Sequence, residues 1–157
     1  PDGSNNWHLK VLHTPGHAVD HLCYLDSRYN AAIIGDMIST LSTIVIDPPE
    51  GHMSTYLDQL ARLLQQPITT VYPSHGPPRR DGTALIAQFI EHRKEREKEI
   101  INALSTTQHG IEKLLPIVYK DVPKEAYPVA SRSLLAGLIK LEEDGVACQL
   151  DDRWQLS

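Results

Sequence analysis

The sequence contains few cysteines, no long apolar run and no excess of positive charge. Its two cysteines, Cys23 and Cys148, lie in short apolar stretches far apart in the chain, which favours buried free thiols over a disulfide. No stretch approaches the roughly 18 apolar residues that a membrane-spanning helix needs. The net charge of −5 argues against strong non-specific binding to nucleic acid. We therefore expect a cytoplasmic protein that makes no membrane contact.

The composition that remains is that of an ordinary globular protein. Of the 157 residues, 41% are hydrophobic and 22% are charged, which is enough for one or two small domains.

The stretch HTPGH at residues 13–17 joins two runs that are typical of β-strands. Apolar residues precede it at 7–12 and follow it at 22–25. Pro15 and Gly16 favour a tight loop between the two runs. Such a loop can place an imidazole at the end of a strand. The alternative is a Pro-Gly turn with incidental histidines, which three histidines within nine residues make less attractive.

Two further predicted strands also end in a polar side chain. The apolar run 31–34 leads into Gly35 and Asp36, and the β-rich run 69–72 leads into His75. A carboxylate at the mouth of a buried strand is costly unless it is paired or binds a metal. Imidazole and carboxylate together suit zinc, and also iron or manganese. The strand-end residues His17, Asp36 and His75 are therefore candidate metal ligands.

In this order, the motifs HTPGH, GD and SHGP resemble those of the metallo-beta-lactamase-fold hydrolases. The string HTPGHAVDH, a long helix after residue 82 and a C-terminal winged helix are similar to the beta-lactamase-like protein 2 group. The resemblance implies two divalent metals, with zinc as the first choice and manganese or iron as alternatives. It also implies that His17 binds one metal, that His75 binds the other, and that Asp36 bridges both and takes part in catalysis.

The same resemblance implies that further ligands lie outside this sequence. The family carries an HxHxDH string in the first half of its domain, and no such string occurs here. The sequence opens instead with a polar, turn-like segment at residues 1–6. We therefore expect the C-terminal part of a metal hydrolase, whose partner is the missing N-terminal half of the same domain. The 157-residue chain alone is expected to be inactive.

The remaining histidines have weaker assignments. His21 follows His17 by four residues, so it is a candidate proton donor or substrate contact, with a structural role as the alternative. His13 is expected to hold the loop, and Asp20 to orient one of the rings. The other four have ordinary surface explanations: His8, His52, His92 and His109.

The predicted fold class is α/β: the C-terminal half of an αββα sandwich, followed by an α+β winged-helix domain. The predicted boundaries are 1–82 for the half-sandwich, 83–106 for a linking helix and 107–157 for the winged helix. Apolar residues at helical spacing predict three helices besides the linking helix, and two strands around Asp151-Asp152 predict a hairpin. The helices fall near 53–64, 111–119 and 134–141, and the strands at 146–150 and 153–156.

Two further stretches lie outside these motifs. Residues 41–46 fit either a strand or a loop over the site. Residues 91–99 alternate in charge at helical spacing, which predicts a solvated helix face.

Three functions compete. In the first, two cations lower the pKa of a bridging water to about 7, and metal-bound hydroxide attacks an ester-type bond or a single-stranded RNA phosphodiester. In the second, the winged helix binds nucleic acid or protein without catalysis. Residues 84–157 contain ten basic and twelve acidic residues, and the hairpin tip is acidic. Both features argue against binding to a nucleic-acid duplex. In the third, an exposed sheet edge pairs two chains as a homodimer.

Overall fold

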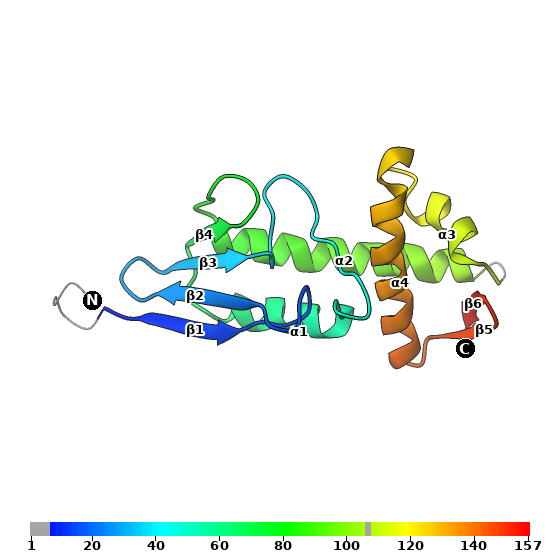
Figure 1. Ribbon diagram of the computed structural model, residues 1–157, viewed down its shortest axis with the longest axis horizontal. Coiled ribbons are helices and arrows are strands. Elements are labelled where there is room, and N and C mark those ends of the chain that lie inside the picture. Colours follow the sequence, from blue (N-terminus) through cyan, green and yellow to red (C-terminus); the bar gives the residue numbers. More distant parts are fainter. Residues whose placement is uncertain (1–6, 106–107) are drawn as a thin grey trace.

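One long helix, α2 (Gly82–Leu104), runs through both halves of the computed structural model, which describes residues 7–105 and 108–157 (Figure 1). The first half contains β1 (Leu9–His13), β2 (Leu22–Asp26), β3 (Ala31–Gly35), α1 (Met53–Leu64) and β4 (Thr70–Pro73). The second half contains α3 (Ile111–Val118), a 3-10 turn (Lys124–Ala126), α4 (Tyr127–Glu143), β5 (Ala147–Leu150) and β6 (Arg153–Leu156).

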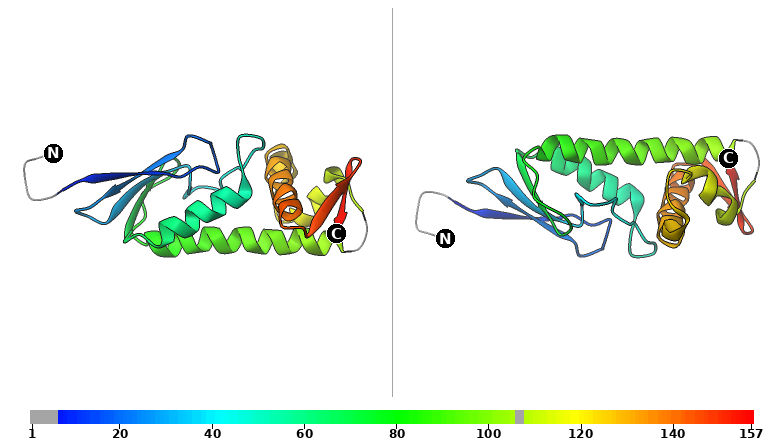
Figure 2. Two further views of the ribbon diagram at one scale, coloured as in Figure 1. Left: turned by 90° about the horizontal axis from the view of Figure 1, so that it is seen from below. Right: turned by 90° about the horizontal axis from the view of Figure 1, so that it is seen from above.

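The first half is built on a four-stranded sheet in the order β1-β2-β3-β4. The β1–β2 and β2–β3 pairs are antiparallel, whereas β3 and β4 are parallel because α1 provides the crossover between them. β1, β3 and β4 therefore all end at the same edge of the sheet. Helices α1 and α2 cover one face of this sheet (Figure 2).

Two apolar cores lie along α2. The beginning of α2 adds Leu85 and Ile86 to a core that the sheet, α1 and the loop after β3 form. The end of α2 adds Ile100 and Leu104 to a second core with α3, α4 and Trp154 of the hairpin. Helix α4 crosses between them, since its Ala136 belongs to the first core.

The predicted strands and helices are confirmed, and the open question about residues 41–46 is answered. That stretch belongs to a long loop between β3 and α1 and forms no strand. Ile44 and Ile46 anchor the loop because both side chains are buried in the first core. The predicted polar turn at 1–6 and the boundary at 106–107 lie outside the described residues, so the predicted domain limits stay predictions.

The predicted solvated face at residues 91–99 is present but does not include every charged residue of the run. Glu91, Lys94, Glu95 and Lys98 are exposed, whereas Arg93 and Arg96 lie between the two halves and are only 7% and 9% exposed. The expectation of two buried thiols is half right. Cys23 is free and buried, whereas Cys148 is free and only partly buried.

The second face of the sheet carries apolar side chains that reach solvent. Val11, Ile33 and Tyr72 lie in register across the strands and are 54%, 52% and 46% exposed. No helix among the described residues covers this face (Figure 2). Nor is any described helix long and apolar enough to cross a membrane.

The loop between β1 and β2 is packed so closely on α1 that Gly16 has no room for a side chain. Its φ is +133°, and a Cβ there would lie 2.4 Å from the Tyr56 Cα. Gly145 is a matched control, because its φ is also positive, at +71°, but its Cβ position is open.

We expect Gly16→Ala to lower the free energy of unfolding by about 2–4 kcal/mol. The control Gly145→Ala should cost only the left-handed backbone penalty, about 1–2 kcal/mol. Urea denaturation of both variants measures the difference. Equal losses would contradict the close packing of the loop on α1.

Candidate metal centre

The candidate ligands come from the edge at which β1, β3 and β4 end. Asp36 directly follows β3, and His75 follows β4 by two residues. His17 lies in the loop that follows β1. Because these strands run in the same direction, their ends bring residues far apart in the sequence to one edge.

Asp36 and His75 lie next to each other. The His75 Nε2 is 3.4 Å from the Asp36 Oδ1, and the His75 side chain is largely exposed. The same Asp36 Oδ1 is buried and has no hydrogen-bond partner. Leaving a buried carboxylate oxygen without a partner is costly, so this atom has the character of a cation ligand.

His17 is oriented as metal-binding histidines usually are. Its Nδ1 lies 2.8 Å from the Val45 backbone oxygen. Since a carbonyl oxygen can only accept, Nδ1 carries the proton and donates it to Val45. The lone pair is then on Nε2, which leaves that atom as the one able to bind a metal.

His21 uses both of its ring nitrogens inside the protein. Its Nε2 accepts a hydrogen bond of 3.0 Å from the backbone N–H of Asp36. Its Nδ1 therefore carries the proton and lies 2.8 Å from the Thr14 hydroxyl. Gly35 leaves room for this ring, because a Cβ there would lie 2.5 Å from the His21 Nε2.

The electrostatic surroundings of His21 favour its neutral form. Burial is the largest effect and lowers the pKa of His21 below its usual value. The negative charge of Asp36 opposes that shift, and the neighbouring His17 adds to it. A neutral ring is required for its Nε2 to accept the Asp36 N–H.

The structure brings together part of the expected ligand set. Asp36 and His75 are adjacent, and His17 is turned so that its Nε2 is available. Among the described residues, no group of three or more His, Cys, Asp or Glu side chains is close enough to hold a metal ion. The donors present fit a divalent cation in chemistry, since a carboxylate oxygen without a hydrogen-bond partner lies beside an imidazole. They do not, however, surround a cation on all sides.

The other histidines differ from one another in role. His13 holds its loop, with Nε2 2.8 Å from the Val19 backbone oxygen. His52 was expected to be an ordinary surface residue, but its ring makes two contacts within the protein. Its Nδ1 caps α1 by accepting from the Thr55 N–H, and its Nε2 lies 2.7 Å from Glu143 on α4. His52 thus ties α1 to the second half of the protein.

Sequence reasoning missed Arg93 and Arg96. Both occur in a charged run, yet they continue the apolar stripe of α2, since Arg93 follows Phe89 by four residues and Arg96 precedes Ile100 by four. That spacing was the available signal, because an arginine on a buried helix face needs partners.

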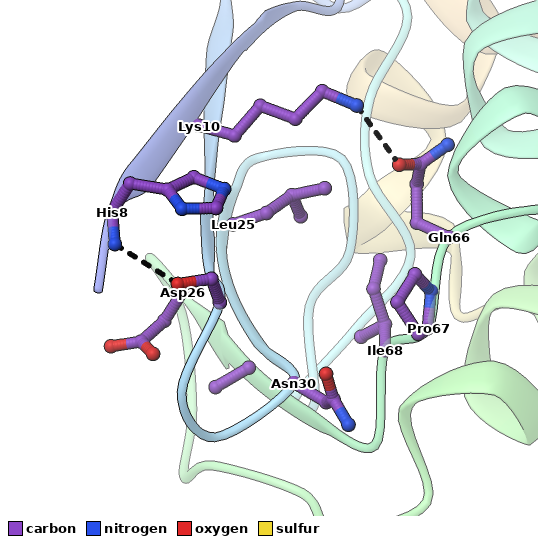
Figure 3. A pocket seen from close by; sticks show the side chains of 10 residues that line it. His8, Lys10, Leu25, Asp26, Asn30, Gln66, Pro67 and Ile68 are labelled. Carbon is purple, nitrogen blue, oxygen red and sulfur yellow. Dashed lines mark hydrogen bonds between the residues drawn. The ribbon is translucent and has the colours of Figure 1, made fainter. Parts of the chain in front are cut away.

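A pocket of ≈ 290 Å³ at the opposite end of the sheet lies away from these residues (Figure 3). Asp26 and Asn30 line it, and a hydrogen bond of 3.3 Å from the Lys10 ammonium to the Gln66 side-chain oxygen crosses its upper part. It contains none of the candidate ligands.

Two family models match the chain. Residues 3–75 match the metallo-beta-lactamase superfamily. Residues 111–154 match the beta-lactamase associated winged helix domain.

The chain is also similar to individual proteins and solved structures with related names. The chain is 29% identical to a beta-lactamase-like protein 2 homolog of Drosophila melanogaster, over 92% of this chain and 48% of that protein. It is also 29% identical to an atrochrysone carboxyl ACP thioesterase of Aspergillus chevalieri, over 75% of this chain and 41% of that protein. The crystal structure of a metallo-beta-lactamase family protein from Thermus thermophilus superposes with a TM-score of 0.83 at 20% identity, covering 95% of this chain and 49% of that one. The chain thus spans about half the length of the curated relatives it matches.

We expect the chain to bind zinc weakly through Asp36. A full structural zinc site is worth about 10–16 kcal/mol, so roughly half of the ligands should give a Kd of roughly 1–200 µM. Isothermal titration with zinc measures it. Asp36→Asn should abolish binding, whereas Asp58→Asn, which removes an exposed carboxylate on α1, should not change it. Nanomolar affinity, or binding that survives Asp36→Asn, would contradict this assignment.

Proposed function

Because the chain belongs to the metallo-beta-lactamase superfamily, we propose that it forms one side of the active site of a metal-dependent hydrolase. The donors in the chain are His17 through Nε2, the carboxylate of Asp36 and His75 through Nε2. In this proposal the three side chains would help to hold two divalent cations, with zinc preferred over manganese and iron, and Asp36 would be a ligand to both. Such cations, when bound, supply a water that is deprotonated near neutral pH.

One observation carries the proposal: a buried carboxylate oxygen of Asp36 lacks a hydrogen-bond partner beside the Nε2 of His75. A carboxylate kept for a purely structural role is normally satisfied by donors from the protein. Here the backbone donor of Asp36 itself is used to hold His21. The side chain therefore remains available to a cation.

We assign His21 to positioning rather than to proton transfer with substrate. Its two ring nitrogens bind Thr14 and the backbone of Asp36, so a proton transfer through either atom would break one of these contacts. The hydrogen bond to the Asp36 N–H fixes the peptide from which the bridging carboxylate projects.

The substrate class that we propose is an ester-type compound, with a single-stranded RNA phosphodiester as the alternative. Support for the ester comes from the relative named as an acyl carrier protein thioesterase. Nucleic-acid binding by the winged helix has less support, because Asp151 and Asp152 form the exposed tip of its hairpin.

We further propose that the 157-residue chain shows no turnover alone. Its three donors do not come together as a group, and a two-metal site must hold both the attacking and the leaving oxygens. The exposed apolar face of the sheet, with Val11, Ile33 and Tyr72, is the surface that we propose for the complementary half of the domain. A second copy of the chain is the alternative occupant.

The test joins this chain to the portion of the Drosophila relative that the alignment leaves out. With zinc or manganese, the joined protein should hydrolyse a thioester or a single-stranded RNA oligonucleotide, whereas the chain alone should hydrolyse neither. His75→Ala should lower kcat/KM at least about 100-fold, because even residues that only orient a metal ligand are worth 10–100-fold.

His109→Ala is the matched control, since this histidine lies in the second half of the protein and pairs with Trp154. This substitution should leave the kcat/KM of the joined protein unchanged. A folded, metal-loaded joined protein that turns over neither substrate would refute the hydrolase assignment.

A further inference from the structure

A pocket of ≈ 350 Å³ lies between the two halves of the protein and includes none of the candidate metal ligands. Arg93 and Arg96 of α2 line it from one side, and Tyr119 and Ser133 from the other. Thr43 of the loop between β3 and α1 also lines it. This volume is within the range of small-molecule sites.

Arg93 brings a positive charge into this pocket that no described carboxylate balances. Its side chain is 93% buried, and it takes part in none of the ion pairs among the described residues. Its Nη2 donates to the Ile44 backbone oxygen, its guanidinium lies 5.5 Å from the centroid of the Tyr56 ring, and its Nε has no partner. An unbalanced buried charge is strongly unfavourable.

Arg96 lines the same pocket, but carboxylates balance its positive charge. Its guanidinium makes two hydrogen bonds of 3.1 Å to the carboxylate of Asp121 and lies 2.8 Å from Glu99. Asp121, the carboxylate that lines the pocket, is therefore already paired. The net positive charge of the pocket rests on Arg93.

The positive charges of the pocket also affect the pKa of the neighbouring His92. Burial is the larger cause of its lowered pKa, and the charges of Arg93 and Arg96 lower the pKa further. The hydroxyl of Ser133, which accepts from the Ile46 N–H, keeps its own proton for donation to a ligand.

The pocket is connected to the candidate metal centre through two consecutive peptides. The Ile44 carbonyl accepts from Arg93, and the next carbonyl, that of Val45, accepts from His17. A second pocket of ≈ 310 Å³ shares Thr43 and His92 with the first and includes Thr40, whose N–H donates to the His75 backbone oxygen. The two pockets thus lead from Arg93 towards the edge that holds Asp36.

From this arrangement we infer that the pocket between the two halves binds an oxyanion, a phosphate or carboxylate group, through Arg93 and the hydroxyls of Ser133 and Thr43. We assign this anion to the substrate, as the charged end that points away from the bond to be cleaved. That the anion belongs to the substrate rests on the proposed function; that an anion binds here does not.

The experiment titrates the protein with inorganic phosphate, and separately with acetate, while sodium chloride keeps the ionic strength constant. The ¹⁵N signal of the Arg93 Nε–Hε group should move saturably with one of the two anions but not with chloride. Isothermal titration should show that Arg93→Gln weakens binding at least about tenfold, because hydrogen bonds to charged groups are worth about 1.5–3 kcal/mol.

Arg153→Gln is the control, since Arg153 is exposed on β6, outside the pocket. The affinity of the Arg153→Gln variant for the anion should equal that of the unmodified protein. The wild-type Arg93 signal decides the matter even where Arg93→Gln fails to fold. An unmoved Arg93 signal, or equal effects of chloride, would overturn the inference. Anion binding without any turnover of the joined protein would keep the pocket and refute only the hydrolase.

Discussion

The buried carboxylate oxygen of Asp36 is the constraint on which the arrangement of the first half depends. The parallel pairing of β3 and β4 brings His75 to within 3.4 Å of it. Gly35, with φ of +58°, leaves the space in which His21 accepts the Asp36 N–H. The loop after β1 places His17 on the same side. Each local feature is explained if this oxygen is kept free for a cation.

A second constraint joins this edge to the rest of the protein. The loop between β3 and α1 lacks regular structure, so those of its peptide groups that find no partner within the loop need one on another element. Arg93 from α2 and His17 provide such partners at two consecutive carbonyls. His52 and Glu143 connect α1 to α4 in a similar way. Ser133 of α4 also accepts a hydrogen bond from the Ile46 N–H of this loop. The second half therefore helps to hold the loop beside the site.

The sequence predicted those features that depend on local pattern. Strand-end motifs correctly placed His17, Asp36 and His75 just beyond β1, β3 and β4, and helical spacing located α1 and α2, because both follow from backbone periodicity. The burial of Arg93 was harder to predict. Its spacing on the apolar stripe was a signal, but its charged neighbours gave a solvated pattern, and its partners Ile44 and Tyr56 are far from it in the sequence. Likewise, residues 41–46 have strand composition, but no strand in the described part of the chain pairs with them.

The central claim is that Asp36 and His75 bind a cation. Its most direct test is a crystal of the protein soaked with zinc and measured at the zinc absorption edge. The account predicts an anomalous peak at about 2.0–2.2 Å from a carboxylate oxygen of Asp36 and from the Nε2 of His75. A peak only at another pair, such as His52 and Glu143, would contradict it.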